Sequence, residues 1–146
     1  MRKMTVPRRN KNRGYQQLRV WQDAIELFRQ VCEVVRPWRY EYKKLSAQLM
    51  ASADSVHRNI AEGYCRRSIH EYLNFLNIAL GSLGETVSAV HAYRVAGQID
   101  EQAFEPLDAL AFRLENSLLK LVESLERKRA RGDWISTLIE TEQPDP

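Results

Sequence analysis

The histidine and carboxylate residues of this sequence are not spaced for a shared metal site. A helical bundle that binds two iron ions needs glutamates from two helices and a Glu-x-x-His pair from each of two more. The nearest match is Asp54-x-x-His57, which occurs once, and His70 and His91 have no carboxylate three residues before them. We therefore expect no metal ion and no cofactor.

Ser82 and the acidic residues give no better basis for catalysis. Ser82 lies in a Gly-Ser-Leu-Gly segment that lacks the strand–turn–helix context of a nucleophile elbow. A metal-dependent nuclease would need clustered acids, and here the acids are dispersed along the chain. We predict that the protein is not an enzyme, and such a nuclease is the enzymatic alternative.

Asn59, Glu62 and Gly63 lie where one predicted helix gives way to the next. Glu62 can accept hydrogen bonds from the backbone amides that begin the following helix, or it can pair with Arg66 or Arg67. Either arrangement fastens two helices together, so we interpret Glu62 as structural rather than catalytic.

The first 20 residues concentrate positive charge. They contain seven basic residues and no acid, a charge of +7, which leaves 15 basic and 19 acidic residues, or −4, on the other 126. A basic segment on a mildly acidic body favours a polyanionic partner. A solvated tail that keeps the protein soluble is the alternative. The seven basic residues are Arg2, Lys3, Arg8, Arg9, Lys11, Arg13 and Arg19.

Length and composition indicate one domain. The chain has 146 residues, 44% hydrophobic and 28% charged, as in ordinary globular proteins. No apolar run is long enough to span a membrane and the first residues lack the apolar core of a signal peptide, so we expect a cytoplasmic protein without membrane contact. Cys32 and Cys65 form no Cys-x-x-Cys pair, and we interpret them as buried thiols of a reducing compartment.

Apolar residues recur at helical spacing in four segments. The first pattern follows Leu18 and stops at Pro37. The second ends at Gly63, which suits the left-handed position after a helix. The predicted stripes are Trp21, Ile25, Phe28, Cys32 and Val35, and then Leu45, Leu49, Ser52, Val56 and Ile60.

Capping residues delimit the other two helices. Ser68 and Glu71 form a capping box, and Gly97 ends that helix. Asp100 caps the fourth helix, which contains Pro106 within about its first turn, where proline costs least. Arg131-Gly132 ends this helix. The predicted stripes are Tyr72, Phe75, Leu76, Ala79, Leu83, Val87, Val90 and Ala96, and then Phe104, Leu107, Leu110, Leu114, Leu118, Leu121 and Leu125.

These patterns predict an all-α fold, an antiparallel up-down-up-down four-helix bundle. We assign residues 1–17 to a basic flexible arm, 18–131 to the bundle and 132–146 to an acidic tail with a short apolar pattern at Trp134, Ile135, Leu138 and Ile139. Gly81, Gly84, Ser88 and Ala92 form a row of small residues on the third helix. Glycine inside a helix costs about 1 kcal/mol relative to alanine, so we expect another helix or another subunit to pack against this row.

The predicted topology gathers basic residues at one end of the bundle. The start of the first helix, the end of the second, the start of the third and the end of the fourth share that end. The seven basic residues of the first segment therefore join Arg58, Arg66, Arg67, Arg127, Lys128, Arg129 and Arg131, which makes 14 of the 22 basic residues. Tyr15 and Tyr64 are placed to stack on exposed bases there, and a core position is the equal alternative for Tyr64. The opposite end mixes the acids Glu41, Asp100, Glu101, Glu105 and Asp108 with Arg36, Arg39, Lys43 and Lys44.

A combination of short motifs resembles a known family. The motifs are Asn59-Ile60-Ala61-Glu62-Gly63-Tyr64, Arg66-Arg67, Phe75-Leu76, Ala79, Gly81-Ser82 and Glu85, with Leu18-Arg19-Val20-Trp21, Leu45 and Gln48 upstream. They resemble the bacterial four-helix-bundle proteins encoded in intervening sequences of large-subunit ribosomal RNA genes. Those proteins resemble, in turn, the accessory variability proteins of diversity-generating retroelements. The match covers roughly residues 18–127 and departs at Ala51, usually an arginine, and at Asp54, commonly apolar.

The resemblance implies a non-enzymatic bundle that assembles into a ring, usually a pentamer. For the retroelement relatives it also implies a basic surface that binds nucleic acid and docks a reverse transcriptase.

We therefore predict a homo-oligomeric accessory protein that binds RNA or DNA, alongside a reverse transcriptase. The alternative is a protein-interaction scaffold of the ribosomal-RNA type that does not bind nucleic acid. The predicted phosphate contacts are Arg8, Arg9, Lys11, Arg13, Arg58, Arg66, Arg67, Arg127, Lys128, Arg129 and Arg131.

Overall fold

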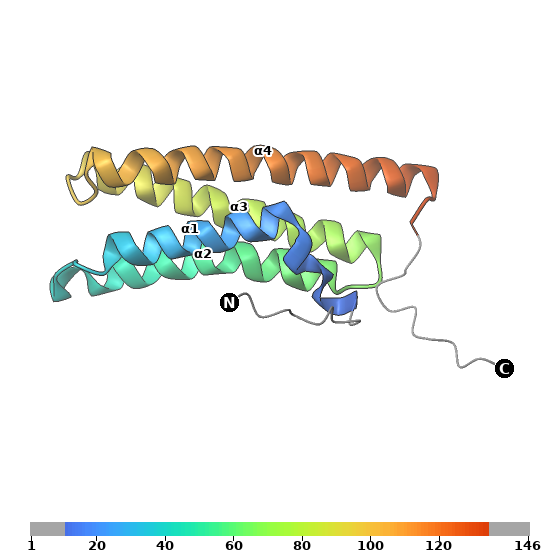
Figure 1. Cartoon of the computed structure of the whole chain (residues 1–146), viewed down its shortest axis with the longest axis horizontal. Helices are drawn as coiled ribbons and strands as arrows, with labels where there is room; N and C mark the ends of the chain where they lie inside the picture. The colour runs from blue at the N-terminus through green and yellow to red at the C-terminus, as the bar shows by residue number, and fades with distance from the viewer. Residues whose placement is uncertain (1–10, 135–146) are drawn as a thin grey trace, which may run out of the picture.

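The computed structural model describes residues 11–134, and this part of the chain consists of helices and connections without a strand (Figure 1). The prediction of an all-α, up-down-up-down four-helix bundle is confirmed. The elements are the 3-10 helix η1 (Lys11–Gln17), α1 (Arg19–Val35), the 3-10 helix η2 (Tyr40–Tyr42), α2 (Lys43–Tyr64), α3 (Ile69–Val95) and α4 (Glu101–Arg131).

Four of the predicted helix boundaries have the expected chemistry. The Ser68 hydroxyl accepts a hydrogen bond from the Glu71 amide, and the Asp100 carboxylate accepts one from the Ala103 amide at 2.8 Å. Gly97 and Gly132 have φ angles of +80° and +69°, the left-handed conformation that glycine adopts most readily. Local sequence therefore fixes where α3 and α4 begin and end.

The prediction for Gly63 was wrong. Gly63 lies inside α2 and is buried, and α2 continues to Tyr64. A Cβ atom at position 63 would lie 2.8 Å from Phe75 Cβ and 2.9 Å from Tyr72 Cδ2. Glycine is needed here because α3 packs closely against α2, rather than because the backbone turns.

Pro106 also lies deeper in its helix than expected. It is the sixth residue of α4, in the second turn, where proline removes a backbone hydrogen bond. The side chain lines an open groove beside Trp38 and Ile99.

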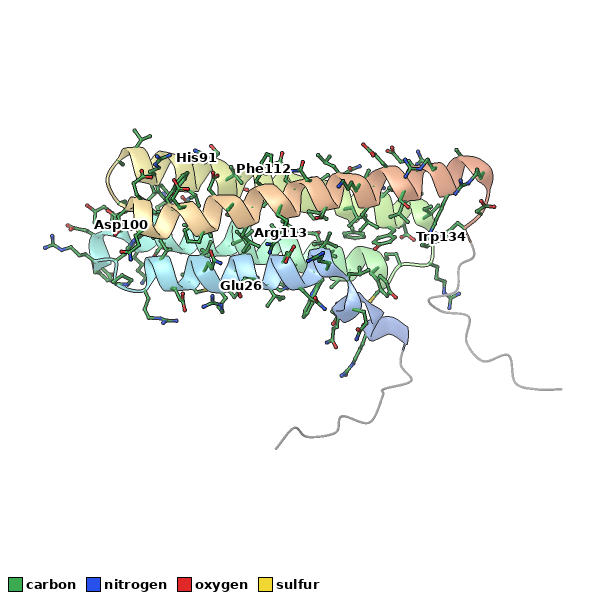
Figure 2. The ribbon with its side chains drawn as sticks, turned by 45° about the horizontal axis from the view of Figure 1, so that its top comes forward. Glu26, His91, Asp100, Phe112, Arg113 and Trp134 are labelled. Carbon is green, nitrogen blue, oxygen red and sulfur yellow. The ribbon has the colours of Figure 1, made fainter. Side chains whose placement is uncertain are left out.

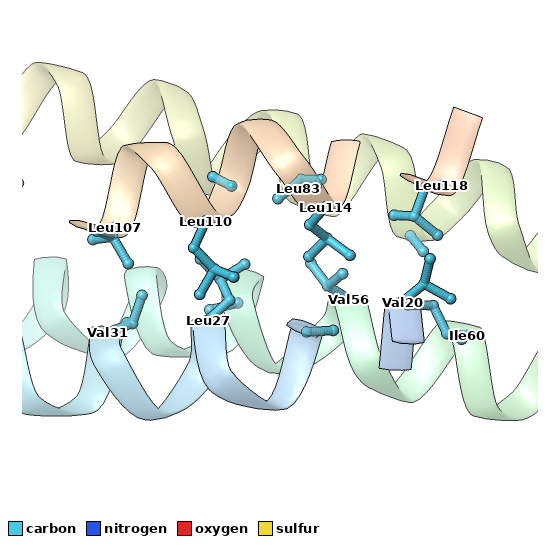
Figure 3. Close-up of a cluster of buried hydrophobic side chains, with 14 of the residues drawn as sticks. Val20, Leu27, Val31, Val56, Ile60, Leu83, Leu107, Leu110, Leu114 and Leu118 are labelled. Atoms are coloured by element: carbon cyan, nitrogen blue, oxygen red, sulfur yellow. The ribbon is translucent and has the colours of Figure 1, made fainter. Parts of the chain in front are cut away.

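The core runs along the whole bundle, and Figure 3 shows its central layers. Most predicted core residues of α2, α3 and α4 are buried, but Leu45 and Ala96 are exposed. In α1 the predicted stripe is displaced by one residue. Trp21, Ile25, Phe28 and Cys32 are half-buried flanking residues, and the fully buried face is Val20, Ala24, Leu27, Val31 and Val35. Both stripes are apolar, so periodicity alone does not identify the central one.

One ion pair joins the first helix, α1, to the last helix, α4. Asp23 is almost buried on α1, and its carboxylate accepts hydrogen bonds from the Arg113 guanidinium at 3.1 and 3.3 Å. Figure 2 shows Arg113 on the side of α4 that faces α1. Pairing with Asp23 raises the pKa of Arg113 above its ordinary value.

Residues 11–17, which we assigned to the arm, form η1 and pack on the bundle. Tyr15 contacts Trp21 and Tyr64, and a Cβ atom at Gly14 would meet the ring and hydroxyl of Tyr64. The ordered structure therefore begins before the predicted boundary at residue 18. Within the described range, none of the helices is both long enough and apolar enough to cross a membrane.

Candidate nucleic-acid interface

The end of the bundle that was predicted to be basic is assembled from four elements. The start of α1, the end of α2, the start of α3 and the end of α4 lie at the same end (Figure 1). Direct contacts hold these segments together: Tyr15 meets Tyr64, and the Trp134 indole N–H donates to the Arg67 carbonyl at 3.0 Å.

Five aromatic rings form a continuous chain across this end. The centroid distances are 5.4 Å for Trp21–Tyr15, 6.3 Å for Tyr15–Tyr64, 6.1 Å for Tyr64–Tyr72 and 6.1 Å for Tyr72–Trp134. These are edge or tilted contacts of the kind that aromatic pairs prefer. Burial raises the pKa of the Tyr72 hydroxyl well above its ordinary value. Tyr15, predicted to stack on bases, and Tyr64, predicted either to stack on bases or to belong to the core, are both half-buried in this chain of rings.

Trp134 is the last described residue and packs back onto the bundle. Its ring lies against Tyr72, and its N–H bonds to the connection between α2 and α3 (Figure 2). The short apolar pattern of Trp134, Ile135, Leu138 and Ile139 was assigned to the tail. Residues 135–139 lie outside the described residues, whereas Trp134 itself contacts its own chain.

Arg66 is the most constrained of the predicted phosphate ligands. Its guanidinium lies 2.9 Å from the Glu62 carboxylate, 3.7 Å from the Glu71 carboxylate and 5.0 Å from the centroid of the Phe75 ring. The predicted pairing of Glu62 with Arg66 is confirmed, and it joins the end of α2 to the start of α3. Because two acids already neutralise Arg66, little of its charge remains for a phosphate.

Two further predicted ligands form ion pairs with acids close in sequence. Arg58 lies 3.3 Å from Asp54, and Arg131 lies 3.0 Å from Asp133. Both arginines are largely exposed, and an exposed pair of this kind contributes less than about 1 kcal/mol. A phosphate can therefore compete for Arg58 and Arg131 more easily than for Arg66.

The end of α4 carries the least compensated positive charge. Residues 126–131 are all exposed, which on a helix means that every side of this segment meets solvent. Arg127, Lys128 and Arg129 make no ion pair with any other residue in 11–134. In Figure 1 this end of α4 projects beyond the other three helices.

The remaining predicted ligands lie toward the N-terminus. Arg13 is exposed on η1, and Lys11 is the first residue of that helix. Arg67 is exposed in the connection between α2 and α3. Arg8 and Arg9 lie outside the described residues.

The motif residues Asn59 and Ser82 belong to a polar seam between α2 and α3, defined as Ser52, Ser55, Asn59, Ser82 and Thr86. The Ser55 and Ser82 hydroxyls are 2.8 Å apart, and the Asn59 amide donates to the Ser55 carbonyl at 2.7 Å. Thr86 is buried and bonds to both Ser52 and the Ser82 carbonyl. Small side chains that hydrogen-bond across the interface allow these two helices to approach closely. A helical pattern of apolar residues does not reveal this seam.

The small-residue row on α3 faces outward. A Cβ atom at Gly81 or Gly84 would have no neighbour within 4 Å, and Ser88 and Ala92 are exposed. The helices of this chain therefore do not pack against the row. Glu85, another motif residue, is exposed on the same helix and forms no salt bridge with a described residue.

Asp54 and His57 are in contact, 2.7 Å apart, but they do not form part of a larger ligand set. Burial by itself would raise the pKa of Asp54, but hydrogen bonds from His57 and Arg58 lower it below its ordinary value. Among residues 11–134, no three histidine, cysteine or acidic side chains are grouped so that they could hold a metal ion.

Comparison with known proteins identifies the family. The family model of the 23S rRNA-intervening sequence proteins matches residues 16–120. Comparison with curated proteins gives no match. A solved structure from Bacteroides thetaiotaomicron VPI-5482, described as a protein of unknown function from the S23 ribosomal protein family, superposes with a TM-score of 0.66. Its sequence is 22% identical, and the alignment covers 70% of this chain and 97% of the other, so this likeness supports the fold alone. The match over residues 16–120 shows that the chain belongs to the 23S rRNA-intervening sequence protein family.

Proposed function

We propose that the protein is a non-enzymatic, cytoplasmic, homo-oligomeric accessory protein that binds RNA or DNA through its basic end. The observation that carries the proposal is the projecting end of α4, where Arg127, Lys128 and Arg129 are exposed and make no salt bridge within the described range. Unpaired cations on a projecting helix can reach phosphates with little desolvation of the rest of the protein.

The remaining cations of this end extend the same surface. Arg13 and Arg67 are exposed on neighbouring connections, and Arg58 and Arg131 hold only exposed ion partners. Since the sequence contains no recognisable base-reading motif, contacts to phosphate would dominate, and affinity would fall steeply with salt.

An exposed apolar surface on α3 and α4 supports the homo-oligomeric part of the proposal. His91 of α3 and Asp108 of α4 lie 2.9 Å apart on the outside of the bundle. Gly84 and Ser88 share the helical face of His91, while Phe112 and Leu119 share the face of Asp108. Phe112 is 68% exposed and Leu119 44% exposed. An exposed apolar surface of this kind suits contact with a second copy, and a ring of five copies would repeat the basic end in each subunit.

The nucleic-acid proposal is tested by fluorescence anisotropy with mixed-sequence RNA and DNA over a range of salt concentrations. Replacing Arg127, Lys128 and Arg129 together with glutamine should weaken binding to all sequences alike. The slope of log affinity against log salt should become shallower by about one for each phosphate that the variant no longer neutralises.

Two lysines of α4 provide a matched control. Lys120 and Lys128 are both exposed, and neither forms a salt bridge within the described chain. Lys128→Gln should weaken binding, whereas Lys120→Gln should not, because Lys120 lies two turns back from the basic end. Equal effects of the two substitutions, or a salt slope near zero, would contradict the proposal.

The resemblance to retroelement accessory proteins suggests a reverse transcriptase as the protein partner at this surface. A reverse transcriptase gene with template and variable repeats beside this gene would support that partner. Placement inside a ribosomal RNA gene, with no measurable affinity for nucleic acid, would favour the protein-interaction scaffold.

A further inference from the structure

A second positively charged surface lies at the end of the bundle opposite the basic end. It is a cleft of about 410 Å³ between the end of α1, the connection through η2 and the start of α2. This connection lies at the far left of Figure 1, away from the end of α4. The residues that matter for the argument are Cys32, Arg36, Trp38, Arg39, Tyr40 and Lys43, all of which line the cleft.

The lining of the cleft contains three cations and no carboxylate. Within residues 11–134, Arg36 and Lys43 form no salt bridge, and Arg39 has only an exposed contact with Glu41 at 3.5 Å. The sequence suggested that the acids of this end balance these cations. Four of the five acids, Asp100, Glu101, Glu105 and Asp108, lie at the start of α4 and do not line the cleft, and the fifth, Glu41, is the exposed partner of Arg39.

Three of these acids at the start of α4 are already engaged. Asp100 caps its own helix, Glu101 pairs with Arg94, and Asp108 pairs with His91. The cleft therefore keeps a net positive charge within a space large enough for a small ligand, since ligand sites commonly begin at about 300 Å³.

An exposed aromatic ring lies beside these cations. Tyr40 is 83% exposed, and the Lys43 ammonium lies 5.3 Å from the centroid of its ring. Trp38 forms a fixed wall of the cleft because its ring packs edge-on against Tyr93 at 5.6 Å and Tyr42 at 6.4 Å. An aromatic face with adjacent cations is the arrangement that stacks on a base and holds its phosphate.

We infer that this cleft binds a nucleoside phosphate, in which Arg36 and Lys43 contact the phosphate groups and Tyr40 stacks on the base. The ligand is a free nucleotide or an unpaired nucleotide of a strand, which share this chemistry. An inorganic anion would be bound by the cations without a contribution from Tyr40. An acidic peptide has no base that could stack on the Tyr40 ring. The inference does not rest on the basic end, which lies at the other end of the bundle and consists of different basic residues.

Binding is tested by titrating the full chain into a fluorescently labelled nucleoside triphosphate. Tyr40→Ala should weaken binding by about 5- to 150-fold, the range that removal of one base–aromatic stack produces. Tyr40→Phe should bind like the original protein. Arg36→Gln with Lys43→Gln should remove the preference for the triphosphate over the unphosphorylated nucleoside. Since Tyr40, Arg36 and Lys43 are exposed, these variants should fold normally.

The two cysteines allow the site to be located independently. Cys32 lines the cleft, whereas Cys65 follows α2 at the basic end. Burial raises the pKa of both thiols, so alkylation is followed at mildly alkaline pH and read for each peptide by mass spectrometry. A nucleotide should slow the alkylation of Cys32 and leave that of Cys65 unchanged. Replacing Arg127, Lys128 and Arg129 should not alter this protection, which separates the inference from the proposed function.

Competition identifies the source of the ligand. A single-stranded oligonucleotide that displaces the labelled nucleotide and protects Cys32 would assign the cleft to a strand, and a nucleotide that competes better would assign it to free nucleotides. The inference is overturned if Tyr40→Ala binds like the original protein, if inorganic triphosphate or an acidic peptide competes as well as the nucleotide, or if Cys32 is not protected.

Discussion

At the scale of single residues, several conspicuous positions of the sequence have structural roles. Glu62 pairs with Arg66, and Asn59 belongs to the polar seam between α2 and α3. Gly63 allows Tyr72 and Phe75 to approach α2. Motif residues of this kind set the distance between two helices, and the cations that remain available for a partner lie elsewhere.

Gly63→Ala should destabilise the protein. The new Cβ atom would lie 3.1 Å from the Tyr72 carbonyl oxygen and closer still to two side chains, and overpacking of this kind costs about 1–3 kcal/mol. Urea unfolding followed by circular dichroism at low protein concentration measures the change in the free energy of unfolding. Gly81→Ala is the control, because Gly81 is exposed with open space around it and alanine there should stabilise the helix by up to about 1 kcal/mol. The assignment of Gly63 to close packing fails if both substitutions stabilise the protein.

Asp54→Asn should lower stability at neutral pH but not in acid. Hydrogen bonds from His57 and Arg58 lower the pKa of Asp54 in the folded state, so its stabilisation is present above the unfolded-state pKa and is lost as the pH falls through the folded-state pKa. The difference between the two proteins, less than about 1 kcal/mol for this partly exposed group, should therefore shrink over the range from neutral pH to a pH below the ordinary pKa of an aspartate. Thermal unfolding across this range measures it. Glu85→Gln, at an exposed carboxylate without a salt bridge in the described chain, should show a smaller difference at every pH.

At the scale of elements, the helices are fixed by local chemistry and the connections by tertiary contacts. Ser68 and Asp100 start α3 and α4 with side-chain caps, and Gly97 and Gly132 end them. In contrast, η1 has no apolar period, and it is held by Tyr15 and Gly14 against Tyr64. An element held in this way can be released without unfolding the bundle.

Gly14→Ala should detach η1 from the end of α2. A Cβ atom at this position would lie 2.9 Å from the Tyr64 ring, so either the ring or the 3-10 helix must move. We expect faster amide hydrogen exchange in residues 11–17 and unchanged exchange in the buried parts of α3 and α4. Gln17→Ala, an exposed position of the same element, should leave exchange as it is. Slower or equal exchange in Gly14→Ala would contradict the role given to this glycine.

At the scale of the whole molecule, the bundle is asymmetric in charge and in apolar surface. Cations without acidic partners in the described chain lie at both ends, on α4 at one end and at the α1–α2 connection at the other. The outer surface of α3 and α4 exposes Phe112 and Leu119 beside two glycines. Figure 2 shows Phe112 and His91 on the side where these two helices meet. A subunit that associates through this surface would keep both ends accessible.

Phe112→Glu should reduce the mass of the protein in solution. A charged side chain placed in a contact between subunits would be desolvated without a partner, so the assembly should dissociate. Light scattering at tens of micromolar protein measures the mass. Leu45→Glu is the control, because Leu45 is a partly exposed apolar residue of α2, away from this surface. A monomeric mass for the original protein would refute the homo-oligomer, and an unchanged mass for Phe112→Glu would place the contact elsewhere.

The sequence by itself determined the fold class, the four helices and the end at which basic residues gather. Helical periodicity and capping residues are local signals, and short connections leave few ways to arrange four helices. The pairing of Glu62 with Arg66 was also predictable, because Arg66 follows Glu62 by four residues, just beyond the end of α2. Membership of the family was visible in the Asn-Ile-Ala-Glu-Gly motif.

Only the tertiary structure decided which of two adjacent apolar stripes of α1 is buried, why residue 63 is glycine, and which cations are neutralised. Each of these depends on atoms from another helix: α2 and α4 beside α1, Tyr72 and Phe75 beside Gly63, Glu71 beside Arg66. Packing likewise determines that the acids at the start of α4 do not line the cleft at the α1–α2 connection. Charge counted along a chain gives a total, but the distances between charges, which govern their interaction, are set by packing.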